Sequence, residues 1–240
     1  MDLEVASAGR MFISVNNDGV ILLAVEGFSC FAEMTTGRWH DLYRSTSKQG
    51  EGHMNQLPML SAVQIAGERV LLRKARDADR EGLIELQTDP DVWAYIGVPR
   101  LREDAEQRLD AIGGAANATA TAGHFIIADK ATDNLIGTFE LKRRAADEPG
   151  HVTDDGEELE LGYLMRRDAW GAGLAFEAAS AALRAAADQL PDQPVLIATQ
   201  TANKRSLRLA ARLGFQPVST FEWFDAGQTL CLASLHSFKA

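Results

Sequence analysis

Hydrophobic and polar positions follow regular periods only after about residue 65 of this 240-residue chain. Residues 69–75 alternate as an edge strand would, and residues 78–87 have helical spacing behind Asp77, which can cap a helix. The alanine-rich stretch 172–187 strongly favours a helix. The other predicted elements are a helical turn holding Val92, Trp93 and Ile96, a helix over 103–113, strands over 125–128, 135–141, 159–165 and 195–199, a helix from its cap Asn203 to Leu213, and strands over 215–223 and 228–236.

The order of these elements predicts an α/β (α+β) fold, because strands and helices in this arrangement form a mixed sheet with helices on both faces. The short apolar run 195–199 suits a buried parallel strand. A polar loop rich in Asp and Glu, over 144–157, separates two of the strands. We therefore expect one domain over residues 65–240.

Residues 1–64 form an N-terminal extension with a less regular pattern. Two apolar runs, 11–15 and 20–25, flank the turn signal Asn16–Gly19 and predict a β-hairpin. Residues 44–57 are polar, contain glycine and predict a linker. Because an isolated hairpin is marginally stable in water, we expect it either to dock or to stay mobile.

A second interpretation of this extension is that translation starts at Met54, so that residues 1–53 do not exist in the native protein. Gly50–His53 directly precede Met54. The codons for Gly-Glu-Gly can spell a purine-rich ribosome-binding site at about that distance.

Composition narrows the class of protein. A hydrophobic fraction of 46% and a charged fraction of 24% are those of a soluble globular protein. The net charge of −10 argues against a nucleic-acid binder and suits a cationic acceptor. Cys30 and Cys231 lie far apart, and the histidines form no metal-spaced group, so we expect neither a disulfide framework nor a metal.

Targeting signals are not apparent in this sequence. The acidic start Met-Asp-Leu-Glu does not resemble a secretory signal, and the apolar run Gly19–Val25 is too short to span a membrane. We expect a cytoplasmic protein that does not bind membranes.

The segment Trp170–Ala175, Trp-Gly-Ala-Gly-Leu-Ala, follows a predicted strand and opens a helix. Its glycines allow a tight turn that brings consecutive N–H groups together. At a helix start these groups are unpaired and the helix dipole is positive, so the turn can bind a pyrophosphate. Arg166 and Arg167, just upstream, are within reach of the same phosphates. The alternative is a glycine-containing turn that binds nothing.

This segment resembles the acetyl-CoA loop of the GNAT acetyltransferases, usually Q/R-x-x-G-x-G/A. Gly171–Ala172 fill the variable pair and Gly173–Ala175 complete the pattern. Trp170 replaces the usual Gln or Arg, a departure that resembles the branch acting on ribosomal-protein N-termini. That branch commonly has a Gly-Tyr pair upstream of Trp-Gly-x-Gly, which Gly162–Tyr163 match.

Two further phrases resemble the same branch. Asn203–Phe215 looks like its N-x-x-S helix ending in Leu-Gly-Phe, and Asp89–Trp93 looks like its early acceptor-side segment. The resemblance covers about 65–240 and implies a GNAT-like, mostly antiparallel sheet. It also implies that strands 159–165 and 195–199 splay apart to admit the pantetheine arm of acetyl-CoA, which serves as co-substrate. The coenzyme-binding residues so implied are Leu164 and Met165 through their backbone, Arg166, Arg167, Trp170, Gly171, Ala172, Gly173, Leu174, Ala175 and Asn203.

Two residues are catalytic candidates through this resemblance. Glu160 occupies the place where some GNAT enzymes carry a general base, and Ser206 could stabilise or protonate the leaving thiolate. The alternatives are that Glu160 belongs to a solvated acidic strand end with Glu157 and Glu158, and that Ser206 satisfies a helix N–H. Asn203 likewise either contacts the coenzyme or caps the helix.

The expected reaction is acetyl transfer to a primary amine, with a protein N-terminus or a small amine as acceptor. At pH 7 an α-amino group is about a tenth neutral, whereas a lysine is neutral in fewer than about one molecule per thousand. A site with a single base therefore acylates a low-pKa amine more easily. We expect a monomer or homodimer. The competing interpretations are a non-catalytic acyl-CoA-binding sensor and a Rossmann-type nucleotide binder, whose glycine turn would belong after the first strand.

Overall fold

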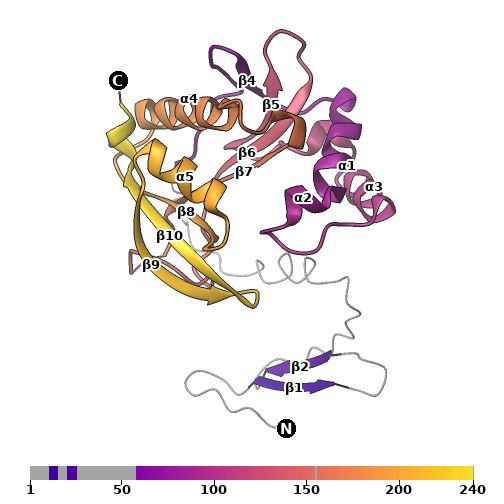
Figure 1. The fold of residues 1–240 in the computed structure, drawn as a ribbon, viewed down its shortest axis with the longest axis vertical. Helices are drawn as coiled ribbons and strands as arrows, with labels where there is room; N and C mark the ends of the chain where they lie inside the picture. Colours follow the sequence, from indigo (N-terminus) through magenta and orange to yellow (C-terminus); the bar gives the residue numbers. More distant parts are fainter. Residues whose placement is uncertain (1–10, 16–20, 26–57, 155, 240) are drawn as a thin grey trace, which may run out of the picture. The chain divides into compact units, whose positions relative to one another are not determined.

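The computed structural model describes residues 11–15, 21–25, 58–154 and 156–239. The chain divides into two compact units, Met1–Gln56 and Leu57–Ala240 (Figure 1). The second unit therefore begins eight residues before the predicted boundary at 65.

The first unit contains two described strands. β1 (Met11–Val15) and β2 (Ile21–Val25) pair in antiparallel orientation, with Met11 opposite Val25. The predicted turn at Asn16–Gly19, the predicted linker over 44–57 and Met54 lie outside the described residues.

The second unit is built on an eight-stranded sheet. Every neighbouring pair is antiparallel except β7 and β8, which are parallel. The predicted α/β fold with a mostly antiparallel sheet is thus confirmed. In their order across the sheet the strands are β3 (Gln64–Ala66), β4 (Val70–Arg73), β5 (His124–Asp129), β6 (Leu135–Arg143), β7 (Leu159–Met165), β8 (Pro194–Gln200), β10 (Ala226–Ser234) and β9 (Gln216–Trp223).

Strand β4 is not the edge strand that alternation predicted. The edge position belongs to β3, which pairs with β4 in antiparallel orientation. β3 is only three residues long, too short for alternation to reveal it.

Five α-helices flank this sheet in the described part of the unit. Residues that commonly cap helices predict some of their ends correctly and others wrongly. The cap Asn203 accepts a hydrogen bond from the Ser206 N–H, and Gly214 ends the helix at a φ of +99°, both as predicted. Asp77 does not cap a helix: it opens a 3₁₀ turn, Asp77–Asp79, ahead of the first helix. The helices are α1 (Arg80–Thr88), α2 (Pro90–Trp93), α3 (Arg102–Ala111), α4 (Leu174–Gln189) and α5 (Lys204–Leu213).

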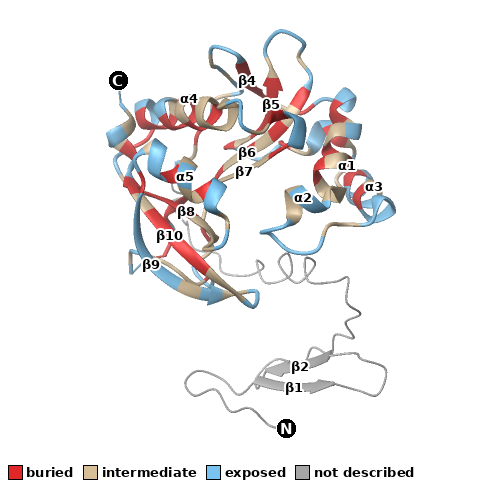
Figure 2. Ribbon diagram, viewed as in Figure 1, coloured by how far each residue is buried: buried red, intermediate tan, exposed pale blue. Residues whose placement is uncertain are grey.

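The helices cover both faces of the sheet and bury two apolar cores (Figure 2). Helices α4 and α5 lie on one face, where Phe125, Phe139 and Leu161 are buried. Helices α1 and α3 lie on the other face, over Ile126 and Leu164, with Leu164 partly buried.

Strands β7 and β8 separate after a short paired stretch. They pair at Leu159 with Val195 and at Glu160 with Leu196, and no later residue of these two described strands pairs with the other. Both the parallel pairing and the separation are as predicted. The opening this leaves in the middle of the sheet is adjacent to the turn that leads into α4 (Figure 1).

Candidate active site

The turn between β7 and α4 presents a row of unpaired backbone amides. No N–H from Gly171 to Phe176 has an acceptor among the described residues. The row is bounded by the Trp170 N–H, which donates to the Arg167 carbonyl, and by the Glu177 N–H, which donates to the Gly173 carbonyl. Unpaired amides at the start of a helix favour an anion.

Two glycines give this turn its shape. Gly171 and Gly173 have φ values of +78° and +79°, which only glycine adopts without strain. A side chain at Gly171 would meet no described atom within 4 Å, and Gly171 and Ala172 are exposed. Helix α4 begins at Leu174 rather than at the predicted residue 172, because Gly173 is left-handed.

Three arginines that sequence analysis missed stand beside this turn. Nitrogens of Arg69 and Arg212 lie 3.8 and 3.9 Å from where a side chain at Gly173 would start. Arg69 also donates to the Ala172 carbonyl, at 3.1 Å. The Arg205 guanidinium lies 4.7 Å from the ring centroid of Trp170. The open glycine turn and the arginines beside it therefore suit an anionic pyrophosphate in both shape and charge.

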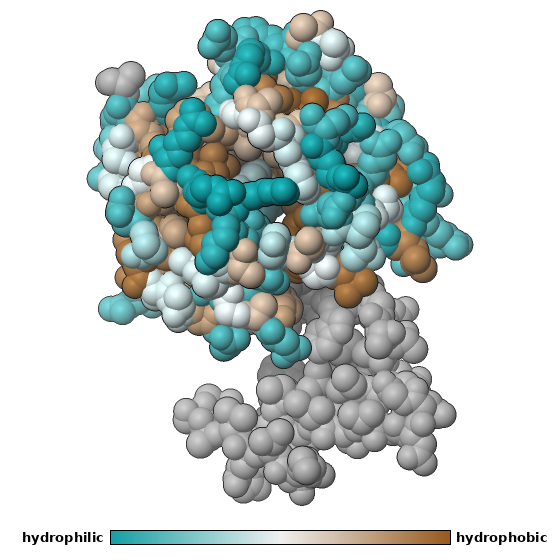
Figure 3. All heavy atoms as spheres, in the orientation of Figure 1, coloured by the Kyte–Doolittle hydropathy of each residue, from teal (hydrophilic) through white to brown (hydrophobic). Residues whose placement is uncertain are grey.

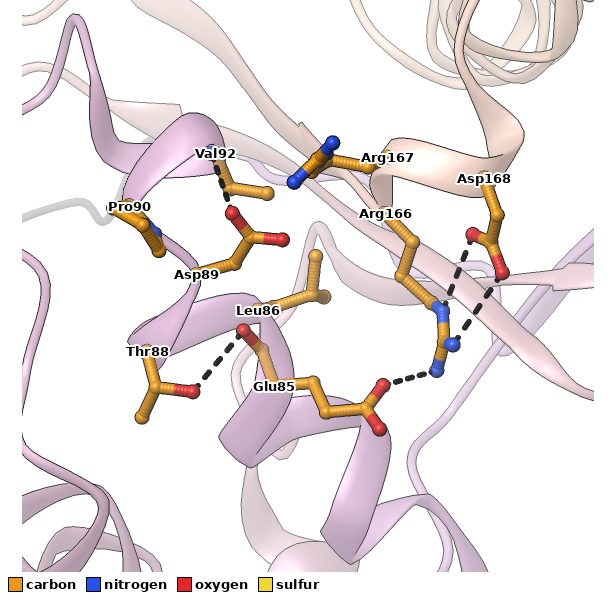
Figure 4. A pocket seen from close by; sticks show the side chains of 9 residues that line it. All are labelled: Glu85, Leu86, Thr88, Asp89, Pro90, Val92, Arg166, Arg167 and Asp168. Atoms are coloured by element: carbon orange, nitrogen blue, oxygen red, sulfur yellow. Dashed lines mark hydrogen bonds and ion pairs between the residues drawn. The ribbon is translucent and has the colours of Figure 1, made fainter.

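The predicted phosphate contacts, Arg166 and Arg167, are engaged elsewhere. Arg166 pairs with Glu85 at 2.5 Å and with Asp168 at 3.4 Å, and Arg167 pairs with Asp91 at 2.6 Å. They lie against a pocket of about 740 Å³ between α1–α2 and the end of β7 (Figure 4). Two of their carboxylate partners, Glu85 and Asp91, come from a different part of the chain, which spacing around the glycine turn could not reveal.

The backbone of β7 offers donors to the opening at alternate residues. The Arg166 N–H donates to the Ile136 carbonyl beside β6, so even-numbered residues direct their backbone groups toward β6. Leu164 belongs to that set, which removes it as a donor at the opening. Tyr163 and Met165 belong to the other set and direct their N–H groups into the opening.

Trp170 packs against the core, and its own amide is already paired. Its indole N–H donates to the Met165 carbonyl at 2.8 Å, and its ring is partly buried against the main core. Leu174 and Ala175 also pack there, while their N–H groups stay unpaired. The last predicted coenzyme contact, Asn203, uses its side-chain oxygen to cap α5.

Ser206 lies on the face of the sheet that carries α4 and α5. It is 7% exposed, and its hydroxyl hydrogen-bonds with Tyr163. Burial raises the pKa of the Tyr163 phenol, and the hydrogen bond with Ser206 opposes this rise. The Ser206 hydroxyl is buried and that of Tyr163 belongs to a partly buried side chain next to the opening.

Glu160 lies on the opposite face of the sheet, because strand residues alternate between faces. Its Oε1 accepts from Arg144 at 2.9 Å, and its buried Oε2 has no hydrogen-bond partner among the described residues. Burial raises the pKa of the Glu160 carboxyl, against the opposing charges of Lys142 and Arg144. A buried carboxylate with one oxygen unbonded is suited to accept a proton.

The neighbouring glutamates do not share this environment. Glu157 is exposed. Glu158 is buried and accepts from His151 at 2.6 Å and from the N–H groups of Val152 and Thr153 at 2.6 and 2.8 Å. Of the three residues of the supposed acidic strand end, only Glu157 is solvated.

These features agree with comparisons to known proteins. The sequence model of the family described as "Acetyltransferase (GNAT) domain" matches residues 69–216. The chain belongs to the GNAT acetyltransferase family. An uncharacterized N-acetyltransferase of Bacillus licheniformis, p20, is 27% identical to the GNAT chain over 151 residues, which are 62% of this chain and 80% of p20.

Solved structures share the fold of this GNAT enzyme. A GNAT-family acetyltransferase from Bacillus anthracis superposes with a TM-score of 0.56 at 22% identity, covering 72% of this chain and 98% of its own. The ribosomal-protein-S5-alanine acetyltransferase of Vibrio fischeri gives 0.53 at 18%, covering 75% and 100%. Spermidine N-acetyltransferase from Vibrio cholerae, in complex with CoA and spermine, gives 0.55 at 16%, covering 71% and 98%.

The family excludes or disfavours the competing interpretations. The mostly antiparallel sheet, with its glycine turn late in the chain, is not that of a Rossmann-type binder. A family of acetyltransferases does not favour a non-catalytic sensor.

Candidate membrane spans and clusters of potential metal ligands are both absent from the described residues. None of their helices is long and apolar enough to cross a membrane. They contain no group of three or more His, Cys, Asp or Glu residues that could hold a metal ion.

Proposed function

We propose that this GNAT enzyme transfers an acetyl group from acetyl-CoA to a primary amine, either a protein N-terminus or a small amine, by direct attack in a ternary complex. The observation that supports this most directly is the row of unpaired amides from Gly171 to Phe176 beside the opening between β7 and β8. On the face seen in Figure 3, hydrophilic side chains border a hollow between α4–α5 and α1–α2.

The coenzyme would be held at both ends of this opening. The amides of Gly171–Phe176, with Arg69 and Arg212, would bind its pyrophosphate. Inside the opening, the N–H groups of Tyr163 and Met165 would bind amide and thioester oxygens. Donors fixed in this way stabilise negative charge that develops on an acyl oxygen. When bound, acetyl-CoA supplies the thioester that the amine attacks.

The two proton transfers of this reaction would take place on opposite faces of the sheet. Glu160 would take the proton from the attacking amine on one face. On the other face, Ser206, hydrogen-bonded to Tyr163, would supply a proton to the departing sulfur. This division supports a reaction in which coenzyme and acceptor enter from opposite sides of the opening.

The acceptor is a primary amine of low pKa in this proposal, because a single base deprotonates such an amine more readily. The net charge of −10 attracts a cationic acceptor. Fold relatives are named for ribosomal-protein and for spermidine acetylation, which are examples of the two acceptor classes. We place the activity in the cytoplasm.

A thiol-release screen tests this function. Acetyl-CoA is incubated with the enzyme and with peptides, amino acids, polyamines or aminoglycosides, and free CoA thiol is measured. We expect release with at least one class of amine. Coenzyme binding without thiol release across the whole panel would favour the sensor instead.

The glycine turn has its own test. Gly173→Glu places bulk and negative charge against the amide row, so calorimetry should show that CoA binding is lost. A matched control is Gly113→Glu, which adds the same residue at another left-handed glycine, φ +85°, after α3 on the other face. Unchanged CoA affinity in Gly173→Glu would refute the assignment of this turn.

A further inference from the structure

The sheet face beside α1 and α3 carries a row of charged side chains that the proposed reaction leaves mostly unexplained. His124 on β5, Glu140 and Lys142 on β6, and Glu160 on β7 project from this face. Cross-strand pairing joins them, since His124 lies opposite Glu140 and Lys142 lies opposite Glu160. The row ends at the last residue of β7 that pairs with β8.

Lys142 stands between two carboxylates without bonding closely to either. Its Nζ lies 3.8 Å from Glu140 Oε1 and 3.9 Å from Glu160 Oε2, both beyond hydrogen-bond distance. Glu160 is 9% exposed, and this Oε2 is buried with no hydrogen-bond partner among the described residues. This buried carboxylate oxygen is thus ion-paired with an ammonium group to which it makes no hydrogen bond.

Gly162 leaves space over β7 for the Glu140 carboxylate. A Cβ at Gly162 would lie 2.7 Å from Glu140 Oε1, so the Glu140 carboxylate occupies the space that any side chain would fill. Gly162 is the second residue of β7 beyond the stretch paired with β8. The Glu140 carboxylate therefore lies over β7 where the opening begins.

Apart from Lys142, the basic groups beside these two carboxylates are already paired. The buried Arg144 guanidinium bonds Glu160 Oε1 and also pairs with Glu148 at 3.2 Å. His124 Nε2 lies 3.3 Å from Glu140 Oε2. Although burial acts to raise the pKa of Glu140, its contacts with His124 and Lys142 hold that pKa below its usual range.

We propose that Glu140 and Glu160 form a seat for one primary ammonium group, which Lys142 fills when no amine is bound. This deepens the proposed function and rests on it, because the acceptor amine would displace Lys142 from the seat. The Lys142 side chain is 37% exposed and has a flexible four-carbon stem, so it can leave without disturbing β6. The seat selects groups with N–H donors and excludes quaternary ammonium, which has none.

A small amine can replace the side chain that defines the seat. Lys142→Ala removes the atoms from Cγ to Nζ, and n-propylammonium reproduces them. We expect n-propylammonium chloride to raise the melting temperature of Lys142→Ala saturably, relative to sodium chloride at equal ionic strength. For the wild type, and for Lys130→Ala, whose lysine instead bonds the Gly67 carbonyl, the shift should require a much higher concentration, because Lys142 occupies the seat in both.

Two comparisons identify the binding group. The uncharged 1-propanol and tetramethylammonium should leave the melting temperature of Lys142→Ala unchanged. Adding Glu140→Gln to Lys142→Ala should weaken n-propylammonium binding at least tenfold. The absence of any saturable shift in Lys142→Ala would overturn the proposal. If this variant does not fold, Lys142→Ser is subject to the same criterion.

The kinetic outcome separates this proposal from the transferase assignment. With an amine found in the thiol-release screen, Lys142→Ala should lower KM for that amine several-fold, and an unchanged or higher KM would count against the seat. Thiol release by the wild type, together with no effect of n-propylammonium on Lys142→Ala, would overturn the seat alone. Saturable n-propylammonium binding without any thiol release would support the seat and refute the transferase.

Discussion

At the scale of single residues, Glu158 and Glu160 differ in what surrounds them, although they are two positions apart on the chain. Burial acts to raise the pKa of both. For Glu158, hydrogen bonds from His151 and from backbone N–H groups outweigh burial and lower the pKa to about 2. For Glu160 burial prevails, and the pKa is raised. The first carboxylate anchors a loop, and the second keeps one oxygen without a hydrogen bond among the described residues.

Glu158 should contribute to stability in a pH-dependent way. Its pKa of about 2 in the folded protein is below the unfolded value of about 4.3. The contribution is therefore complete above pH 4.3 and is lost as the pH falls toward 2. Glu158→Gln should lower the free energy of unfolding by about 1–3 kcal/mol at pH 7 and by much less at pH 2, measured in urea. Equal losses at both pH values would contradict this.

Glu160 should affect turnover and not coenzyme binding. Glu160→Gln should lower kcat by about 10²-fold while CoA affinity, measured by calorimetry, stays unchanged. Because its pKa is raised, the wild-type rate should fall on the acidic side at a higher pH than an ordinary glutamate would produce. Glu157→Gln, an exposed neighbour, is the control. Wild-type rates across pH 6–9 in Glu160→Gln would remove this residue from the mechanism.

At the scale of elements, the turn between β3 and β4 is fastened to the start of α4. Glu177, in the first turn of α4, accepts from the backbone N–H groups of Arg69 and Val70 at 2.5 and 3.2 Å. It also accepts from the Arg69 guanidinium at 2.9 Å. Arg69 is therefore held beside the unpaired amides by a contact between residues 108 positions apart.

This arrangement predicts different effects for two arginines near the glycine turn. Arg69→Gln should weaken CoA binding by about 1.5–3 kcal/mol, or roughly tenfold or more. The loss should shrink at high salt, because Arg69 is half-exposed. Arg166→Gln is the matched control and should change the affinity little, since Arg166 pairs with Glu85. The reverse order of effects, measured by calorimetry, would restore the arginine assignment made from sequence.

Local signals predicted the elements well, and long-range contacts account for the errors. Asn203 and Gly214 fix the ends of α5 through bonds within a few residues, so sequence reveals them. Asp79, by contrast, forms a buried ion pair with Arg73. Helix α1 therefore begins at Arg80, later than the start at residue 78 that was predicted from Asp77.

The candidate site shows the same limit. The glycine turn is visible in the sequence because its backbone conformation requires glycine. Arg69 was missed because it lies about a hundred residues before that turn. Arg205 and Arg212 could have been found from their seven-residue spacing, which places them on one face of α5. Partners of Arg166 and Arg167 on α1 and α2 had no local signal at all.

At the scale of the whole molecule, the main core extends to residues before 69–75, the first strand predicted for the second unit. Leu60 is fully buried in it, and its carbonyl accepts from the Gly123 N–H at 3.1 Å. The segment from Leu57 thus belongs to the second compact unit.

Leu60→Ala should lower the free energy of unfolding by about 2–5 kcal/mol, because it removes buried apolar atoms and leaves a cavity. Val63→Ala, at a position 70% exposed, is the control and should change it by less than about 0.5 kcal/mol. Urea denaturation of both variants measures the difference. Equal effects would mean that this segment does not contribute to the core.

The separation of β7 from β8 gives the molecule two strand edges inside its sheet. At the rim of a sheet, unpaired edges invite another polypeptide to add a strand, which leads to aggregation. Here the two edges face each other inside one sheet, with β6 and β10 paired to their outer sides. A thin, linear molecule with amide groups has the shape to pair with both edges. Unpaired strand edges, which most proteins must cover, can thus serve as a selective binding site in this fold.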